Sequence, residues 1–189
     1  MSTTSKALKV IGGAALAAGA FTAFSRLRYR RSAMATLSEY AVLPTKALRS
    51  RMPVTEWIAR VAGGPEPRRA LSFPFWSRSH YDVERREDDG MPVYYVRPYA
   101  PSDTVVVYLH GGGYITTASL GQSLLIDNLA RRTGADFIVP LYPLAPHHTW
   151  QEAHRLVLDL CARILSDNAD KRVILMGDSA GGGLALVIA

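Results

Sequence analysis

The sequence predicts an α/β protein in which a mixed, mostly parallel sheet lies between helices. Three observations lead to this prediction. From residue 104 onward, continuous apolar runs alternate three times with helical patterns, which is typical of parallel strands covered on both faces. Two shorter strand patterns around a turn precede them at 81–97 and add an antiparallel hairpin to the sheet. Glycine-rich motifs directly follow the first and third apolar runs, at the edge where open α/β sheets bind their ligands.

The chain divides into three regions: a basic and apolar segment at 1–31, helical patterns and a linker at 32–80, and alternating strands and helices at 81–189. The basic residues of 1–31 account for the whole net charge of +6, because this region has no acid. The rest of the chain is neutral, which excludes a basic nucleic-acid face. The single cysteine, Cys161, excludes an intrachain disulfide. Its place in a helical pattern predicts a buried small side chain rather than a reactive thiol.

The N-terminal region contains an uncharged stretch at 10–24, rich in alanine and glycine and flanked by lysines and arginines. As a helix, this stretch spans about 22 Å, which is short of the ~30 Å hydrocarbon core of a bilayer. The flanking basic side chains can extend its reach by snorkelling. We therefore expect residues 6–31 to associate with a membrane surface, as an anchor or an interfacial helix. A signal peptide cleaved near 18–20, a transit peptide, and a loosely packed leader on a cytoplasmic protein are the alternatives.

The region 32–80 contains helical patterns at 34–63 that are broken by Pro44 and Pro53. Pro53 suits the first turn of a helix at 54–62, and the glycines at 63 and 64 end that helix. Residues 64–69 contain two prolines and predict a linker.

The region 81–189 carries the elements of the sheet and its covering helices. Strand patterns at 81–86 and 91–97 flank the turn signal at 88–90. The uninterrupted run at 104–109 (TVVVYL) predicts a strand buried on both faces. Similar runs at 137–142 and 172–176 predict two further buried strands. Helical patterns at 120–132, 150–165 and 181–189 predict the helices that follow these strands.

Two motifs, HGGGY at 110–114 and GDSAG at 177–181, come directly after predicted strands. Ser179 stands where a sharp turn between strand and helix presents a hydroxyl, and Gly177 and Gly181 remove the side chains that would collide there. The helix after Ser179 points its N-terminus at the site, where its free amides favour negative charge. A serine presented in this way, with hydrogen-bond donors nearby, predicts acyl transfer.

The other residues of the two motifs support this interpretation. His110 is expected to orient the glycines through hydrogen bonds, and Asp178 to favour the positive end of the helix. A phosphate-binding glycine turn is the alternative, but the second motif lacks the lysine of a P-loop. The candidate donors to an oxyanion are backbone amides, those of Gly111, Gly112, Gly113 and Ala180.

With these motifs and YPLAP at 142–146, residues 104–189 resemble the hormone-sensitive-lipase-like branch of the α/β-hydrolases, which includes many bacterial carboxylesterases. The resemblance covers the first half of that catalytic domain. It implies an α/β-hydrolase fold with Ser179 as nucleophile, an oxyanion hole built from the amides of Gly112, Gly113 and Ala180, and a loop shaped by Gly111.

The same resemblance implies that the helical patterns at 34–63 form the N-terminal part of a cap over the active site. The chain departs from the family at Leu141 and His147, where an aspartate and a glutamate are usual. These departures concern contacts with the cap and leave the serine chemistry unchanged.

The catalytic acid and histidine are expected after the serine in this fold, whereas all five histidines of the chain precede Ser179. We therefore expect the chain to stop after the nucleophile turn, without the acid and the histidine of the triad. We also expect the 189-residue product alone to have negligible esterase activity. Its last strand should be an unpaired, aggregation-prone edge.

The sequence thus predicts a serine hydrolase that cleaves small carboxylic esters with short to medium acyl groups through an acyl-enzyme, with no cofactor and no metal. An amidase or deacetylase, a non-catalytic ligand-binding protein and an inactive truncated protein stay open. His147, His148 and His154 match no zinc spacing and are expected on the surface or in loops. Tyr114 and Trp150 are expected either to line a substrate pocket or to pack in the core.

Overall fold

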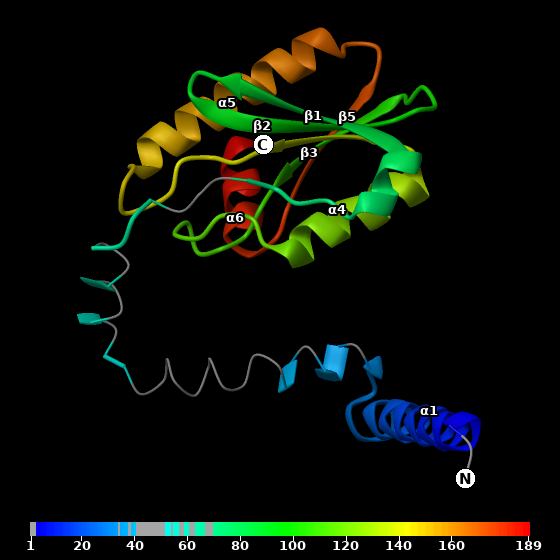
Figure 1. Ribbon diagram of the computed structural model, residues 1–189. Coiled ribbons are helices and arrows are strands. Elements are labelled where there is room, and N and C mark those ends of the chain that lie inside the picture. The colour runs from blue at the N-terminus through cyan, green and yellow to red at the C-terminus, as the bar shows by residue number, and fades with distance from the viewer. Residues whose placement is uncertain are drawn as a thin grey trace. The chain divides into compact units, whose positions relative to one another are not determined.

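The computed structural model describes residues 3–33, 35–37, 39–40, 52–53, 55–56, 59–60, 63–66 and 70–189. These residues form two compact units, Met1–Ile58 and Ala59–Ala189 (Figure 1). The predicted break at Pro44 and the middle of the predicted helix at 54–62 lie outside the described residues. At the expected end of that helix, the amide of Gly63 donates to the carbonyl of Ala59.

The first unit contains the long helix α1, Thr3–Tyr29, which is longer than the uncharged stretch at 10–24. Arg26 and Arg28 lie in its last turn, where cations interact favourably with the helix dipole. Leu16 and Leu27 are largely exposed, at 78% and 84%. None of the described helices combines the length and the apolar character that a membrane crossing requires. Contact of this region with a membrane surface stays a prediction.

The second unit is built on a five-stranded mixed sheet with the order β1-β2-β4-β3-β5. The strands are β1 Tyr81–Asp88, β2 Met91–Pro98, β3 Thr104–Leu109, β4 Asp136–Pro140 and β5 Arg172–Gly177. β2 pairs antiparallel with β1 and β4, while β3 pairs parallel with β4 and β5. The predicted hairpin is confirmed. Its turn residues Asp89 and Gly90 both have positive φ, which suits the tight turn between twisted strands.

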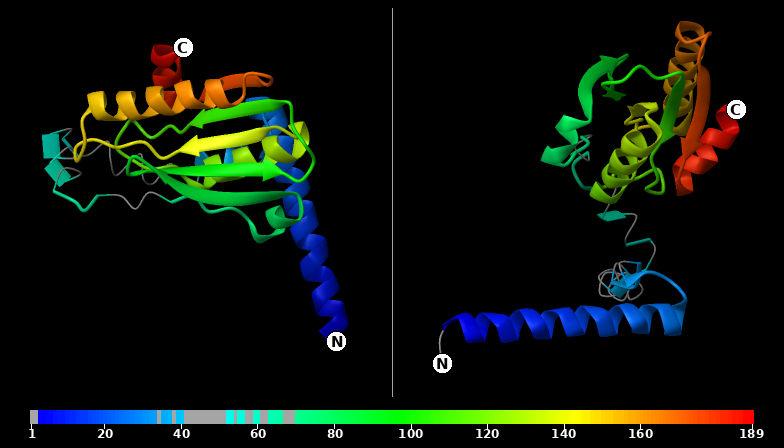
Figure 2. Two further views of the ribbon diagram at one scale, coloured as in Figure 1. Left: turned by 90° about the horizontal axis from the view of Figure 1, so that it is seen from above. Right: turned by 90° about the vertical axis from the view of Figure 1, so that its right-hand side faces the viewer.

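Helices cover both faces of this sheet, as predicted. α5, Trp150–Asp167, and α6, Ser179–Ile188, lie on one face, and α4, Leu120–Thr133, lies on the other (Figure 2). The alternation of β3 explains the two layers. Val105, Val107 and Leu109 pack in the core under α5 and α6, whereas Val106 and Tyr108 pack in the core under α4.

Each of the two longer covering helices begins at a side-chain cap. The Ser119 hydroxyl accepts from the amide of Gln122 at α4, and the Gln122 side chain accepts in return from the Ser119 amide, which forms a capping box. The Thr149 hydroxyl accepts from the amide of Glu152 at α5. Cys161 is buried in α5, as expected, and burial raises the pKa of its thiol to about 11.

Two predicted strands differ from the structure. The run at 137–142 was expected to be strand throughout, but β4 ends at Pro140. The two following residues are buried, and the amide of Leu141 still donates to the carbonyl of Pro92 in β2 at 2.8 Å. The run at 172–176 has the apolar pattern of a strand buried on both faces, but it was also expected to form an unpaired edge. β5 lies at the edge of the described sheet, as expected, and Ile174 is 40% exposed. The apolar pattern alone therefore overestimated the burial of this strand.

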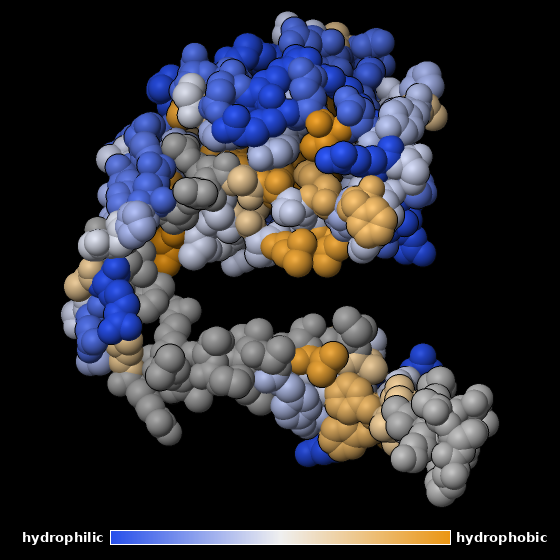
Figure 3. Space-filling model, viewed as in Figure 1, coloured by the Kyte–Doolittle hydropathy of each residue, from blue (hydrophilic) through white to orange (hydrophobic). Residues whose placement is uncertain are grey.

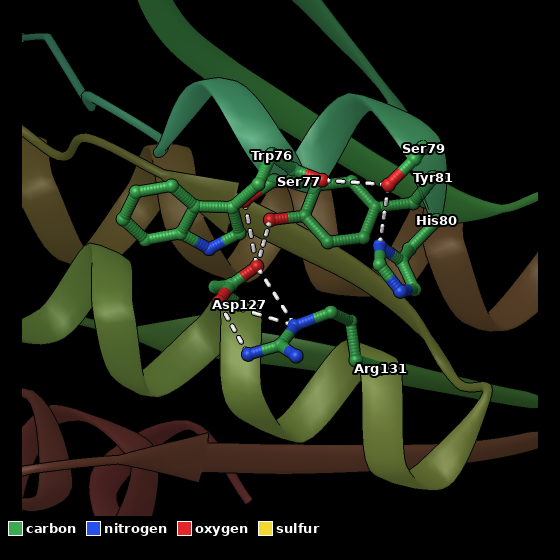
Figure 4. Close-up of polar contacts among 7 residues, drawn as sticks. All are labelled: Trp76, Ser77, Ser79, His80, Tyr81, Asp127 and Arg131. Atoms are coloured by element: carbon green, nitrogen blue, oxygen red, sulfur yellow. Dashed lines mark hydrogen bonds and ion pairs between the residues drawn. The ribbon is translucent and has the colours of Figure 1, made fainter.

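A buried carboxylate joins η1 (Phe75–Ser79), β1 and α4 (Figure 4). Asp127 is 2% exposed and accepts from the Ser77 hydroxyl at 2.7 Å, the Tyr81 hydroxyl at 2.8 Å and an Arg131 guanidinium nitrogen at 2.9 Å. Burial alone would raise the pKa of Asp127, but these donors hold it below its ordinary value. Burial raises the pKa of Tyr81 to about 12. Through these hydrogen bonds, Asp127 of α4 holds η1 and the start of β1 against that helix.

Beside this network, apolar side chains reach the surface over the beginning of α4 (Figure 3). Leu120 is 61% exposed, and Leu124 and Leu125 are about two-fifths exposed.

Candidate active site

Ser179 occupies a strained turn between β5 and α6. Its backbone φ is +49°, a conformation that residues other than glycine rarely adopt. A Cβ on Gly177 would lie 2.4 Å from the carbonyl oxygen of Gly181, and a Cβ on Gly181 would lie 2.1 Å from the carbonyl oxygen of Leu109. Glycine is thus required at both flanking positions, and the turn leaves Ser179 exposed.

The loop of Gly111, Gly112 and Gly113, hereafter the glycine loop, begins at the end of β3. A Cβ on Gly111 would lie 2.4 Å from a carboxylate oxygen of Asp178. Gly112 and Gly113 both have positive φ, and a Cβ on Gly112 would lie 2.4 Å from the carbonyl oxygen of Thr116. This loop therefore approaches the serine turn with bare backbone that no other residue type could replace.

The carboxylate of Asp178 ties the glycine loop to the serine turn. It accepts from the amide of Gly111 at 2.8 Å, the hydroxyl of Tyr108 at 2.6 Å and the side-chain nitrogen of Gln122 at 3.0 Å. The Gln122 nitrogen also lies 3.3 Å from the carbonyl oxygen of Gly111. Burial would raise the pKa of Asp178, but these donors hold it below its ordinary value. The group is thus an anion at neutral pH.

The sequence predicted that Asp178 would favour the positive end of the helix, and the residue is the N-cap of α6 by position. Its side chain makes no capping hydrogen bond. Three donors from β3, the glycine loop and α4 compete with the helix amides and bind the carboxylate instead. The first amides of α6 thereby remain available.

Three backbone amides of the glycine loop and of α6 have no partner of their own, whereas the amide of Gly111, also predicted as an oxyanion donor, is bound to Asp178 and does not serve as one. Within residues 70–189, no acceptor pairs with the amides of Gly112, Gly113 or Ala180. The carbonyl of Gly112 is used in a different way, because it accepts from the amides of Ile115 and Thr116. Gly112 and Ala180 are half-buried, Gly113 is exposed, and the first amides of a helix have no partner within that helix, so these three groups can donate to solvent or to a ligand.

His110 is fully buried and supports the glycine loop, as expected. Its ring stacks on Tyr142, with 4.4 Å between ring centroids, and its Nδ1 lies 2.9 Å from the carbonyl oxygen of Gly111. The Tyr142 hydroxyl donates to the backbone carbonyl of His110. Burial lowers the pKa of His110, although the contact with Gly111 and the charge of Asp178 oppose this shift. The imidazole is therefore neutral and structural.

The other histidines contact groups away from the serine. His80 lies beside the hydroxyl of Ser79. His148 bonds Glu152 through Nδ1 at 3.0 Å and Glu66 through Nε2 at 3.1 Å. Among the residues that the structure describes, none makes a hydrogen bond with the Ser179 hydroxyl, and no group of side chains could hold a metal ion.

An apolar pocket of about 290 Å³ opens beside the glycine loop, and we call it the α5–α6 pocket. Tyr114 and Trp150 both line it, which fits the first of the two roles weighed for them. Its other apolar walls come from the segment after β4, the start of α5, and α6, at Pro143, Ala153, Leu184 and Val187.

Comparison with known proteins identifies the fold. A family model described as the alpha/beta hydrolase fold matches residues 106–189. Over these residues the chain has the α/β-hydrolase fold. An ethyl acetate hydrolase of Pseudomonas putida is 31% identical over 163 residues, which are 78% of this chain and 48% of that enzyme. A triacylglycerol lipase of Mycobacterium tuberculosis is 35% identical over 102 residues, which are 53% of this chain and 23% of the lipase.

Solved structures agree with this assignment. The crystal structure of an esterase from the bacterial hormone-sensitive lipase family aligns with a TM-score of 0.52 and 25% identity, over 69% of this chain and 48% of the esterase. The chain thus spans less than half of the length of these relatives. It resembles esterases and lipases over the part of the hydrolase domain that carries the glycine loop and the serine turn.

Sequence reasoning on this α/β-hydrolase segment missed Tyr108, Gln122 and Tyr142 as members of the site. Tyr108 counted only as an apolar residue of a strand, Tyr142 as a strand residue and the first residue of the YPLAP motif, and Gln122 only as a helical residue. One signal was readable for Gln122, since a glutamine three residues after a serine indicates a capping box. Nothing local indicated that its amide nitrogen would reach Asp178, which is 56 residues away in the sequence.

Proposed function

We propose that this protein hydrolyses carboxylic esters with Ser179 as the nucleophile. The supporting observation is the exposed Ser179 at positive φ, beside amides of Gly112, Gly113 and Ala180 that have no partner in the described residues. Its relatives include an ethyl acetate hydrolase and a triacylglycerol lipase, both of which act on ester bonds. The family and the geometry thus favour the same reaction, acyl transfer to water.

In the proposed reaction, the Ser179 oxygen attacks the ester carbonyl carbon while its proton passes to a histidine base. The carbonyl oxygen becomes an oxyanion and accepts hydrogen bonds from the three amides, and each such donor is typically worth about 3 kcal/mol in the transition state. The carbon–oxygen bond to the alcohol then breaks, and the alcohol leaves with the proton. Water attacks the acyl-enzyme by the same path and releases the carboxylic acid.

We assign to these 189 residues the nucleophile and the oxyanion donors of that reaction. The base and its acid belong, in this proposal, to the part of an α/β-hydrolase that the chain does not span. Two of the histidines are already engaged elsewhere. His110 is buried and neutral against Tyr142, and His148 is held between two carboxylates.

The fixed anion of Asp178 has a positioning role in this proposal. By accepting from Gly111 it holds the glycine loop against the serine turn, so that the donors are in place before the substrate arrives. A preorganised donor costs no reorganisation in the transition state, which is the main source of its catalytic value.

The test is hydrolysis of p-nitrophenyl butyrate by the 189-residue chain and by the chain continued through whatever residues are encoded after Ala189. We expect negligible turnover by the first and a loss of at least a thousandfold in kcat when Ser179→Ala is introduced into the second. Ser166→Ala, at an exposed position in α5, is the matched control and should change nothing. Turnover that survives Ser179→Ala would exclude Ser179 as nucleophile. Serine-dependent turnover by the 189-residue chain would place the base within it.

A further inference from the structure

We propose that the C-terminal end of α1 and the residues after it bind the surface of an anionic lipid bilayer. We call this part of the first unit the aromatic–arginine end, and it comprises residues 21–33, 35–37 and 39–40. The proposal does not depend on the proposed function, because Ser179 and the glycine loop lie in the other unit. It adds a partner surface and the side chains that recognise it.

The aromatic–arginine end is a folded structure. α1 ends at Tyr29, and Arg30 has a φ of +53°, the left-handed conformation that commonly ends a helix. The chain then returns toward the helix, and the hydroxyls of Tyr29 and Tyr40 lie 3.2 Å apart. The Arg31 guanidinium donates to the hydroxyl of Thr36 at 3.2 Å, and Thr36 is fully buried. The side chains of this end are therefore held in place before a partner arrives.

Several apolar side chains of this end are exposed, and its aromatic rings contact one another. The ring of Phe24 packs edge-on against Tyr29, with 5.6 Å between the ring centroids, and its centroid lies 6.5 Å from that of Phe21. Leu27 is 84% exposed and Leu37 is 53% exposed. Exposed apolar groups gathered in this way mark a surface that binds a protein or a membrane. Aromatic rings with a polar tip are favoured where hydrocarbon meets water.

The charge of this end favours a membrane with anionic headgroups. Arginines stand at positions 26, 28, 30 and 31, and the first acid of the chain is Glu39. Among the described residues, Arg31 is the one of these four arginines that pairs with an acid. The guanidinium carbons of Arg28 and Arg31 lie 5.6 and 4.7 Å from the centroid of the Tyr29 ring, so cations and apolar groups adjoin one another (Figure 3). A guanidinium matches a phosphate with two hydrogen bonds, and a bilayer offers phosphates directly above hydrocarbon.

The rest of α1 favours binding along the surface of the bilayer. The uncharged stretch at 10–24 spans about 22 Å as a helix, which is short of the ~30 Å hydrocarbon core. All side chains at 13–20 are exposed, and Leu16 is 78% exposed. Basic residues stand before and after the stretch. A helix that lies in the interface places its apolar middle among the acyl chains and both basic ends among the headgroups.

The expected effects are large enough to measure. Each basic residue near an anionic surface improves binding about fivefold, so three arginines contribute roughly a hundredfold. Moving a leucine side chain from water into an apolar environment improves binding at least about tenfold. The basic and the apolar residues therefore make separate contributions of comparable size.

The experiment is flotation of the 189-residue chain with vesicles of phosphatidylcholine that contain about 30% phosphatidylglycerol, and with vesicles of phosphatidylcholine alone. Flotation separates chain bound to lipid, which rises, from aggregates, which sink. We expect the wild type to bind the anionic vesicles at least about tenfold more tightly than the neutral ones.

A triple variant tests the arginines. Replacing Arg26, Arg28 and Arg30 together with glutamine should weaken binding to the anionic vesicles roughly a hundredfold. The matched control removes the same charge from three exposed arginines of the second unit, Arg132, Arg155 and Arg172. This control should change binding less than about twofold, because these residues lie outside the aromatic–arginine end.

A single variant tests the apolar part. Leu27→Ser should weaken binding to the anionic vesicles at least about tenfold. Leu186→Ser is its matched control in α6, since Leu186 is 83% exposed against 84% for Leu27, and it should leave binding unchanged. All variants should keep the far-ultraviolet circular dichroism spectrum of the wild type, because every substituted residue is exposed.

Three results would overturn the proposal. The first is a wild type that does not float with the anionic vesicles, or that binds neutral vesicles equally well. The second is equal weakening by the two triple variants, since binding would then follow the net charge of the chain rather than this end. The third is Leu27→Ser binding as tightly as Leu186→Ser, since the apolar side chains would then contribute nothing.

Discussion

Gly181 gives the sharpest test of the packing around the serine turn. Replacing it with alanine would place a Cβ 2.1 Å from the carbonyl oxygen of Leu109, 2.5 Å from its carbonyl carbon and 2.6 Å from the carbonyl oxygen of His110. All three are backbone atoms at the end of β3. They cannot turn away as a side chain could, because β3 is paired with β4 on one side and β5 on the other.

The magnitude follows from the displacement required. An ordinary contact begins near 3.4 Å, so α6 and β3 must separate by roughly 1 Å to accommodate the methyl group. Overpacking of this kind typically costs 1–3 kcal/mol, and obstruction by rigid backbone belongs at the upper end, about 3 kcal/mol. Gly182→Ala is the matched control in the next residue of α6, where the nearest atom is the Gly177 carbonyl oxygen at 3.3 Å. It should be neutral, or stabilising by up to about 1 kcal/mol through helix propensity.

The assay is urea unfolding of the 189-residue chain followed by far-ultraviolet circular dichroism. We expect Gly181→Ala to lower the free energy of unfolding by about 3 kcal/mol relative to the wild type, or to prevent folding. Gly182→Ala should match or exceed the wild type. Equal stability of the two variants, or a more stable Gly181→Ala, would refute the close approach of α6 to β3.

Three further predictions test other parts of the structure. Asp178→Asn should cost about 2 kcal/mol at neutral pH, since its amide would oppose the Gln122 donor. Because the pKa of Asp178 is lowered by folding, its contribution to the free energy of unfolding is present above the ordinary pKa of 3.8 and is lost as the pH falls below that value. Urea unfolding at several pH values should therefore show that the stability of the variant falls less steeply in acid than that of the wild type. Asp127→Asn should likewise cost about 2 kcal/mol in urea unfolding. Cys161, with a pKa of about 11, should react with iodoacetamide at pH 8 at least tenfold more slowly in the native chain than in urea.

The sequence was sufficient for the fold because its patterns are local. The alternation of β3 determines which side chains face α4 and which face α5 and α6, and that can be read from six consecutive residues. The hairpin between β1 and β2 is specified by its turn. Burial was harder to predict, because it depends on which strands lie next to each other. β5 is as apolar in sequence as β3, yet it lies at the edge of the described sheet.

The candidate site could be predicted where steric exclusion determines the residue type. Gly177 and Gly181 were expected to clear space for a sharp turn, and the structure gives the atoms that a side chain would meet. Asp178 could not be read in the same way. Its position before a helix predicted an interaction with the positive end of that helix, but it did not indicate the hydrogen-bond partners, which are 56 to 70 positions away. A local preference of about 1 kcal/mol cannot compete with three such donors.

The hydrogen bonds of Asp178 also explain why the two motifs function as one unit. Asp178 is part of the serine turn, and its carboxylate accepts a hydrogen bond from the amide of Gly111. If the glycine loop moved away, this hydrogen bond would break and the carboxylate would lose one of its donors. Such a loss costs more than a neutral hydrogen bond would, so the loop and the serine should open together or not at all. Asp178 uses neither the amide of Ala180 nor those of Gly112 and Gly113, so the bond that fixes the loop leaves these three amides without a partner in residues 70–189. In the proposed reaction, an acid next to the nucleophile would thereby support the oxyanion donors without contacting the substrate.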